Sequence, residues 1–219
     1  MGGMIPLADE SRRTVRSPVA TIAIIAINFG VFILELIGGD QFVMQWSEIP
    51  ADVVAGHHWI TLLTSQFMHA GWMHIIGNMV FLHAFGPRVE DAMGRLKYTL
   101  FYLLSGLVAA LAETAMTPHS TLPSLGASGA IAGVMGAFIV ISPGDQIKTL
   151  WFFGWLARVS FIPAFLLIGV WFFIQLFDQI GSVADVQSGG VAYAAHVGGF
   201  LFGAITGRLF ARSSDFSEW

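Results

Sequence analysis

Cysteine is absent from this 219-residue chain, and charged side chains are scarce. The lack of cysteine excludes disulfide bonds, thiolate metal sites and a cysteine nucleophile. Charged residues make up 11% of the sequence and hydrophobic residues 55%, whereas soluble domains contain about 25% charged residues. Long stretches carry one charge or none. The composition therefore predicts a polytopic membrane protein and excludes an ordinary soluble domain.

Six apolar stretches are candidate membrane spans, and the basic residues lie on one side of them. We place the spans at residues 19–37, 72–85, 98–115, 128–142, 161–177 and 191–210. With the N-terminus inside, the inner segments hold every basic residue: Arg12, Arg13, Arg16, Arg88, Arg95, Lys97, Lys148, Arg158, Arg208 and Arg212. The charged residues of the outer loops are Asp40, Glu48, Asp52, Asp178 and Asp185. By the positive-inside rule, both termini are cytoplasmic.

The predicted fold class is therefore an all-α polytopic membrane protein with six transmembrane helices. We expect residues 1–18 to form a cytoplasmic segment, 19–210 the membrane domain and 211–219 a cytoplasmic tail. A signal peptide is the alternative for the first span, but its apolar run exceeds the usual core of about 7–15 residues and no good cleavage site follows. The outer loop 38–71 and its flank carry Trp46, Trp59 and Trp72. These form an aromatic belt, or the loop packs into the membrane and shapes an entrance, and both can hold.

Four polar residues from three spans lie at a similar depth below the outer surface. Ser128 begins the fourth span, His196 lies about five residues into the sixth, and His74 and Asn78 share one helix face early in the second. A serine hydroxyl needs a base to accept its proton, and histidine is the usual base. Polar groups inside a membrane are expensive and mark functional sites. Their coincidence at one depth predicts a catalytic site.

Each of these residues also has an ordinary structural interpretation. A lone serine among glycines packs helices, a lone histidine serves as a proton relay or a structural hydrogen bond, and an asparagine joins helices. Small residues recur every four positions, at Gly129 and Gly133 and at Gly199, Gly203 and Gly207. Such faces let helix backbones approach closely. Close packing of the fourth and sixth spans would bring Ser128 and His196 together.

Three motifs in this order resemble the rhomboid family of intramembrane serine proteases. They are Gly126-Ala127-Ser128-Gly129, Ala195-His196-Val197-Gly198-Gly199 and the stretch His69-Ala70-Gly71-Trp72-Met73-His74-Ile75-Ile76-Gly77-Asn78. The resemblance extends from about Trp59 to Gly207, through Gly86-Pro87-Arg88-Val89-Glu90 and Trp171-Phe172-Phe173-Ile174-Gln175. A departure is Trp59-Ile60, where many members have a Trp-Arg pair.

The resemblance implies a six-helix bundle and a Ser-His dyad without a triad carboxylate. Ser128 would be the nucleophile and His196 the general base. His74 and Asn78 would stabilise the oxyanion, together with the Ser128 backbone N–H. His69 would hold the first loop, and Gly126, Gly129 and Gly199 would be structural residues near the site. Substrates would be transmembrane segments of membrane proteins, preferably with small or helix-breaking residues near their outer ends, because a regular helix hides its carbonyls.

Two other classes of function compete with this interpretation. The first is a catalytically inactive rhomboid-like adaptor that binds membrane proteins, but such relatives lack the serine or the histidine. The second is a metal site or transporter built from His69, His74 and His196. No His-Glu-x-x-His occurs, and no inverted repeat is visible.

We expect no cofactor, no metal and no nucleic-acid partner, with membrane lipid and membrane-protein substrates as the partners. The simple six-span layout predicts a prokaryotic plasma membrane. Substrate identity and oligomeric state do not follow from the sequence.

Overall fold

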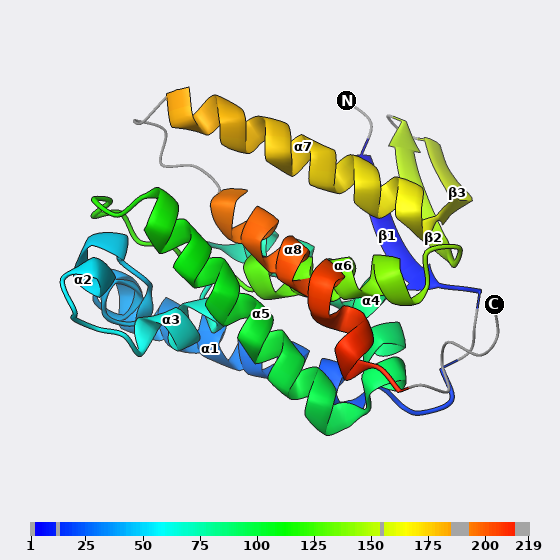
Figure 1. The fold of residues 1–219 in the computed structure, drawn as a ribbon, viewed down its shortest axis with the longest axis horizontal. Coiled ribbons are helices and arrows are strands. Elements are labelled where there is room, and N and C mark those ends of the chain that lie inside the picture. Colours follow the sequence, from blue (N-terminus) through cyan, green and yellow to red (C-terminus); the bar gives the residue numbers. More distant parts are fainter. Residues whose placement is uncertain (1–2, 12–13, 154–155, 185–192, 213–219) are drawn as a thin grey trace.

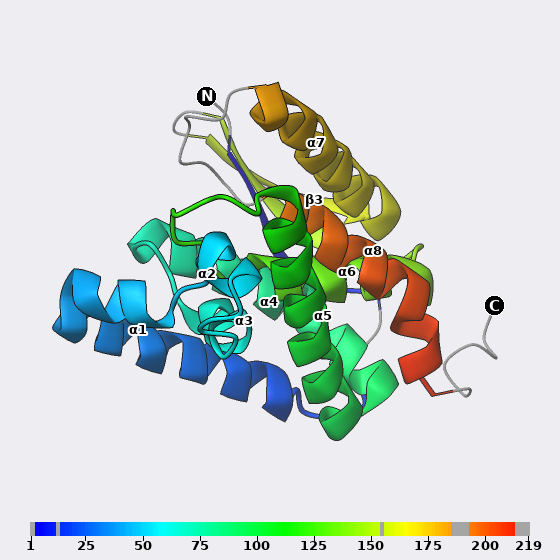
Figure 2. The same ribbon diagram turned by 60° about the vertical axis from the view of Figure 1, so that its left-hand side comes forward.

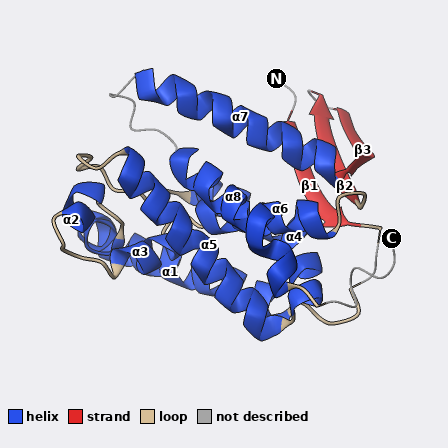
Figure 3. Cartoon of the chain, in the orientation of Figure 1, coloured by secondary structure: helices blue, strands red, loops and turns tan. Residues whose placement is uncertain are grey.

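The computed structural model describes residues 3–11, 14–153, 156–184 and 193–212. Arg12, Arg13, Asp185, the start of the sixth predicted span and most of the predicted tail lie outside these ranges. Figure 3 shows that helices dominate the described part of the chain, with one small sheet at the edge of the bundle.

Each of the six predicted spans corresponds to a helix. The helices are α1 (Val19–Trp46), α4 (Trp72–Met93), α5 (Arg95–Met116), α6 (Ser128–Ile141), α7 (Ala164–Ala184) and α8 (Tyr193–Phe210). The short α2 (Pro50–Val54), α3 (Thr61–Thr64) and η1 (Ser65–Phe67) lie in the long connection between α1 and α4. Three helices differ clearly from their predicted spans. Helix α1 continues nine residues past Ile37 through a kink at Gly39, and α4 ends eight residues later than predicted. Helix α7 begins three residues later and ends seven residues later than predicted.

The six long helices alternate in direction, which gives the bundle two ends (Figures 1 and 2). At one end, the Glu90 carboxylate near the end of α4 accepts the backbone N–H groups of Ala20 and Thr21 at the start of α1. The Arg212 backbone N–H, just after α8, donates to the Ala92 carbonyl in the last turn of α4. We call this end the basic end, because the described basic residues gather there. The start of α6 and the start of α8 meet at the opposite end.

Glycines bring α6 and α8 into backbone contact. A Cβ on Gly199 would overlap the Gly129 carbonyl oxygen, and a Cβ on Gly203 would overlap the Gly133 carbonyl oxygen. On its other side, α6 packs against α5, where a Cβ on Gly129 would meet the Ala109 methyl group at 2.5 Å. The predicted close packing of the fourth and sixth spans is therefore present.

A three-stranded antiparallel sheet at the basic end was not predicted. It consists of β1 (Gly3–Asp9), β2 (Gln146–Phe153) and β3 (Leu156–Pro163), in the order β1-β2-β3. The sequence places these residues in cytoplasmic segments and in the start of the fifth span. β2 follows α6 directly, and β3 runs straight into α7. Arg88 of α4 ties the base of the sheet to the bundle through Asp145, at 3.6 Å, and Ser142, at 2.9 Å.

By length and composition, α1 and α5 are long and apolar enough to cross a membrane, and the segments Ser128–Ile141 and Ala164–Ile174 are shorter apolar helices. Large apolar side chains also lie exposed along the outer surfaces of α1, α5 and α7. An apolar exterior around a tightly packed interior is the pattern of a helical membrane protein.

Candidate active site

The structure brings Ser128 and His196 into hydrogen-bond contact. The Ser128 Oγ lies 2.7 Å from the His196 Nε2. Ser128 is the first residue of α6 and His196 lies in the first turn of α8, so the contact depends on the glycine packing between these helices. His196 is 7% exposed, and its ring packs against Trp171 of α7 and Tyr193 of α8, with centroid separations of 5.8 and 6.4 Å. This is the geometry of a nucleophile beside its base.

His74 faces the turn that precedes Ser128. A Cβ built on Gly126 would lie 2.9 Å from the His74 Cε1 and 3.0 Å from its Nε2. Gly126 has φ +139, a conformation that side-chain-bearing residues rarely adopt, so this position requires glycine for two reasons. The Ala70 backbone N–H donates to the His74 Nδ1 at 3.3 Å. An accepting Nδ1 places the proton of the neutral ring on Nε2, on the side of the ring near Gly126.

Asn78 lies one turn after His74 on the same face of α4. Its Nδ2 is buried and has no hydrogen-bond partner among the described residues. A buried amide donor without a partner is uncommon and needs an explanation. One explanation is that the Asn78 Nδ2 donates to an acceptor that is present only during a reaction.

His69 lies next to His74, and its backbone contacts α1. It is 2% exposed, its backbone N–H donates to Glu35 Oε1 of α1 at 2.8 Å, and its ring packs against His74 with centroids 5.2 Å apart. Burial and the neighbouring His74 lower the pKa of His69 to about 4. His69 thus connects to α1 through its backbone and to α4 through its ring, and the structural role expected for it stays a prediction.

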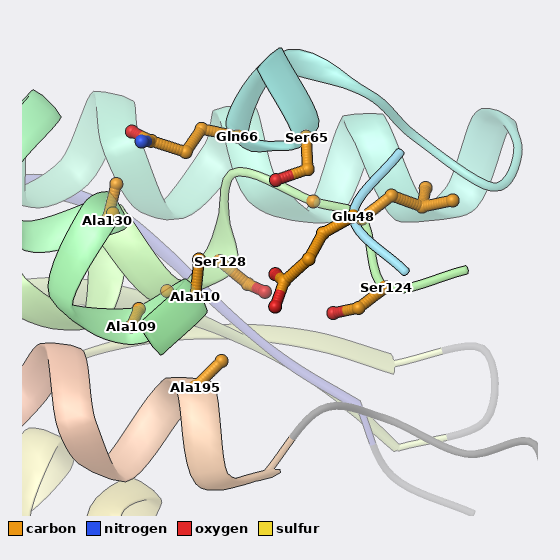
Figure 4. Close-up of a pocket in the computed structure, with 13 residues that line it drawn as sticks. Glu48, Ser65, Gln66, Ala109, Ala110, Ser124, Ser128, Ala130 and Ala195 are labelled. Carbon is orange, nitrogen blue, oxygen red and sulfur yellow. The ribbon is translucent and has the colours of Figure 1, made fainter. Parts of the chain in front are cut away.

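A small cavity of about 30 Å³ opens beside Ser128 (Figure 4). The polar residues of its lining include Glu48, Ser65, Ser124 and Ser128, and alanines and glycines form much of the rest. Figure 4 shows the side chains of Glu48, Ser124 and Ser128 directed toward the same space. A volume of this size accommodates one or two water molecules. The site therefore has room for water next to the Ser128 hydroxyl.

Two acidic residues near the site were missed by the sequence reasoning. Glu48 is 1% exposed, and its Oε1 accepts the Thr114 hydroxyl at 2.5 Å. Burial raises the pKa of Glu48 to about 7. The Oε2 of Glu113, on α5, accepts the backbone N–H of Ala195 at 3.3 Å, one residue before His196. Glu113 could have been found, because a carboxylate inside a predicted span is itself a functional signal.

The rival metal site lacks a ligand set in the part of the chain that the structure describes. No group of three or more His, Asp or Glu side chains there is arranged to hold a metal ion. His69 and His74 pack ring against ring, and His74 Nδ1 and His196 Nε2 are engaged by protein groups.

Residues 56–213, which are 72% of the chain, match the Rhomboid domain family. The chain belongs to this family. Its relatives include the chloroplastic Rhomboid-like protein 11 of Arabidopsis thaliana, which is 25% identical over 94% of this chain and 70% of its own length. The Rhomboid protease GluP of Bacillus subtilis is 29% identical over 85% of this chain and 38% of its own. The mitochondrial Rhomboid protein 1 of Saccharomyces cerevisiae is 28% identical over 88% of this chain and 54% of its own length.

This rhomboid chain therefore spans less than two thirds of the length of the second and third relatives. Membership of the family makes it an integral membrane protein, as the composition predicts. Ser128, His196, His74 and Asn78 all fall within the matched residues, whereas Glu48 and the strand β1 precede them.

Proposed function

We propose that this rhomboid is an intramembrane serine endopeptidase that cleaves transmembrane segments through a Ser128–His196 dyad. The observation that carries the proposal is the 2.7 Å contact between the Ser128 Oγ and the His196 Nε2. It is supported by a protease-named relative, GluP. His196 takes the hydroxyl proton as Ser128 attacks the scissile carbonyl, and later returns a proton to the leaving amine.

The oxyanion is stabilised by donors from two helices. His74 offers Nε2–H and Asn78 offers its unpartnered Nδ2. The Ser128 N–H adds a third donor, because the first N–H groups of a helix lack intrahelical acceptors. A water from the cavity beside Ser128 then hydrolyses the acyl-enzyme, with His196 as its base.

We further propose six spans with both termini and the basic end in the cytoplasm. Helix α6 has 14 residues and is therefore about 21 Å long, shorter than a hydrocarbon core of about 30 Å. Its inner end lies at the basic end, so Ser128 sits below the outer surface, where water enters from outside. The prokaryotic plasma membrane stays a prediction, because relatives are named chloroplastic and mitochondrial as well as bacterial.

The test uses purified protein in liposomes with a fluorogenic single-span substrate. Wild type should cleave it, and Ser128→Ala and His196→Ala should each lower kcat by about 10³-fold or more. Asn78→Ala removes one oxyanion donor and should lower kcat by about 10²-fold. Cleavage that survives Ser128→Ala would exclude the dyad. An inactive adaptor would leave every substrate intact while still binding membrane proteins.

Substrate choice follows from the need to expose a scissile bond. A span with a Gly-Pro pair near its outer end should be cleaved faster than the same span with Leu-Leu there, because the pair weakens the helix. Equal rates for the two substrates would show that unwinding does not govern selection.

A further inference from the structure

The β2–β3 hairpin presents an apolar face that no described part of the chain covers. In an antiparallel pair, residues opposite each other share a face. One face, through Ile147 and Thr149, packs on the bundle, and both residues are 0% exposed. The other face, which we call the outer face, pairs Phe152 with Ala157, Leu150 with Val159 and Lys148 with Phe161. On it, Phe152, Val159 and Phe161 are 36, 51 and 55% exposed.

This outer face continues onto the exposed surface of α7. Phe161 lies three residues before α7 begins, and the exposed side chains Phe165, Leu166 and Val170 follow in its first turns. In an integral membrane protein, such a helix surface faces lipid. The apolar face of the hairpin thus extends a lipid-facing surface toward the basic end. Figures 1 and 2 show the hairpin at the beginning of α7.

The free edge of β3 limits how deep the hairpin lies. β3 is the last strand of the sheet, so its outer edge carries N–H and C=O groups that no strand among the described residues binds. Such groups do not occur exposed in the hydrocarbon core, where each costs several kcal/mol. Headgroups and their water satisfy them, so the strand belongs at the interface.

Charge at the same depth selects the type of lipid. Arg158 is exposed on β3 near the tip of the hairpin, on the face opposite the outer face. It pairs there with Trp151 of β2, whose indole N–H donates to the Ser160 hydroxyl at 2.6 Å. Tryptophan beside arginine is typical of a headgroup layer, and basic residues there attract anionic lipids.

We propose that the β2–β3 hairpin is a lipid-binding element that lies in the headgroup layer at the basic end, with its outer face in the acyl boundary and Arg158 on anionic lipid phosphates. The proposal rests on the membrane orientation of the bundle proposed above and not on catalysis. Because β3 runs directly into α7, lipid bound to the hairpin also anchors the inner end of that helix.

The chain contains no cysteine, so single cysteines report positions without further changes. Spin labels at Val159→Cys, Val170→Cys and Lys97→Cys would be compared in liposomes of phosphatidylcholine with and without phosphatidylglycerol. Collision with oxygen reports lipid, and collision with a water-soluble nickel chelate reports water. The Val159 label should show an oxygen-to-nickel ratio several-fold above that of Lys97 and below that of Val170.

Three results would overturn the proposal. A Val159 label as accessible to nickel as Lys97 would place the outer face in water. Spin–spin broadening between Val159 labels would mean that a second copy covers the face. Anionic lipid should lower nickel access at Val159, and Arg158→Gln should abolish that change; no effect of anionic lipid would exclude the phosphate contact. The measurement needs no substrate and can be made on Ser128→Ala, so failure of the proposed catalysis would not affect it.

Discussion

Glu113 provides the first turn of α8 with an acceptor from a neighbouring helix. The first backbone N–H groups of a helix have no intrahelical partner, and the Glu113 carboxylate takes that of Ala195 at 3.3 Å. The adjacent residue is His196. We therefore expect Glu113 to act as a positioning residue that fixes the direction of the base toward Ser128.

Substitution of Glu113 tests this role by separating the acceptor from the charge. Glu113→Gln keeps an acceptor oxygen and should retain most of the activity. Glu113→Ala removes a cap, a loss of about 1 kcal/mol, and should lower kcat roughly fivefold, at one decade for each 1.4 kcal/mol of barrier, with KM little changed. Steady-state kinetics on both variants checks this. Equal kcat for Ala and wild type, or a change in KM alone, would contradict the positioning role.

Glu48 makes the stability of the protein depend on pH. Burial raises its folded pKa to about 7 from 4.5, so the folded state holds the proton more tightly than the unfolded chain. Its contribution to stability is therefore complete below about pH 4.5 and is lost as pH rises through about 7. Between pH 5 and pH 8 the loss is about 2 kcal/mol, or about 5 °C in Tm.

Thermal unfolding in detergent at several pH values measures this effect. Relative to Glu48→Gln, wild type should lose Tm as pH rises over that range, because glutamine does not titrate. His69 has the opposite sign in an overlapping range: its depressed pKa removes stability as pH falls from about 6.5 toward 4. Both variants share the His69 effect, so the difference between their profiles reports Glu48. Identical pH profiles for wild type and Glu48→Gln would show that Glu48 does not titrate in this range.

At the residue scale, the sequence was sufficient to predict that Ser128 and His196 would meet. Ser128, His196, His74 and Asn78 lie near the outer ends of predicted helices, so helix direction alone brings them to one level. Glu48 was not predictable in the same way. It reaches Thr114 and the cavity through an irregular connection between α1 and α2, and its backbone pairs with Ser124. No periodic pattern encodes such a path.

At the scale of the elements, the contact between α6 and α8 sets the geometry of the site. Adding a methyl group to Gly203 would drive it into the Gly133 carbonyl oxygen, and overpacking of this kind costs about 1–3 kcal/mol. Gly203→Ala should therefore lower Tm by several degrees and reduce cleavage, because the helices must separate or slide.

Gly30→Ala is the matched control for this substitution. Gly30 also lies in a long helix, but a Cβ there meets nothing within 4 Å, so the intrinsic gain of alanine in a helix remains without the clash. Its Tm should equal or exceed that of wild type. If the two alanine variants unfolded at the same temperature, the tight α6–α8 packing would not limit stability.

The helices were more predictable than the sheet because of the lengths involved. A run of about 20 apolar residues reads as a span whatever its surroundings. The strands β2 and β3 have eight residues each, alternate weakly and adjoin apolar helices, so β3 was partly absorbed into the predicted fifth span. β1 forms its ladder with a segment about 140 residues away, and that pairing leaves no local signal.

At the scale of the whole molecule, the structure gathers at one end the basic residues that the sequence places in predicted inner segments. The sequence places every Lys and Arg in predicted inner segments. In the structure, the described basic residues gather at the end where α1, α5 and α7 begin and α4, α6 and α8 end. The active-site residues occupy the other end. We therefore expect the basic end in the cytoplasm and the catalytic end toward the outside.

Single cysteines in the cysteine-free chain can test this orientation in intact bacterial cells. His57 lies exposed in the connection after α2, at the catalytic end, and Lys97 lies exposed in the first turn of α5, at the basic end. A membrane-impermeant maleimide should label His57→Cys in intact cells and Lys97→Cys only after permeabilisation. Moving a basic residue across the membrane is costly. The opposite labelling pattern would mean that the basic residues of the basic end all lie outside the cell. Labelling of Lys97→Cys in intact cells would reverse the orientation, and with it the side from which water reaches Ser128.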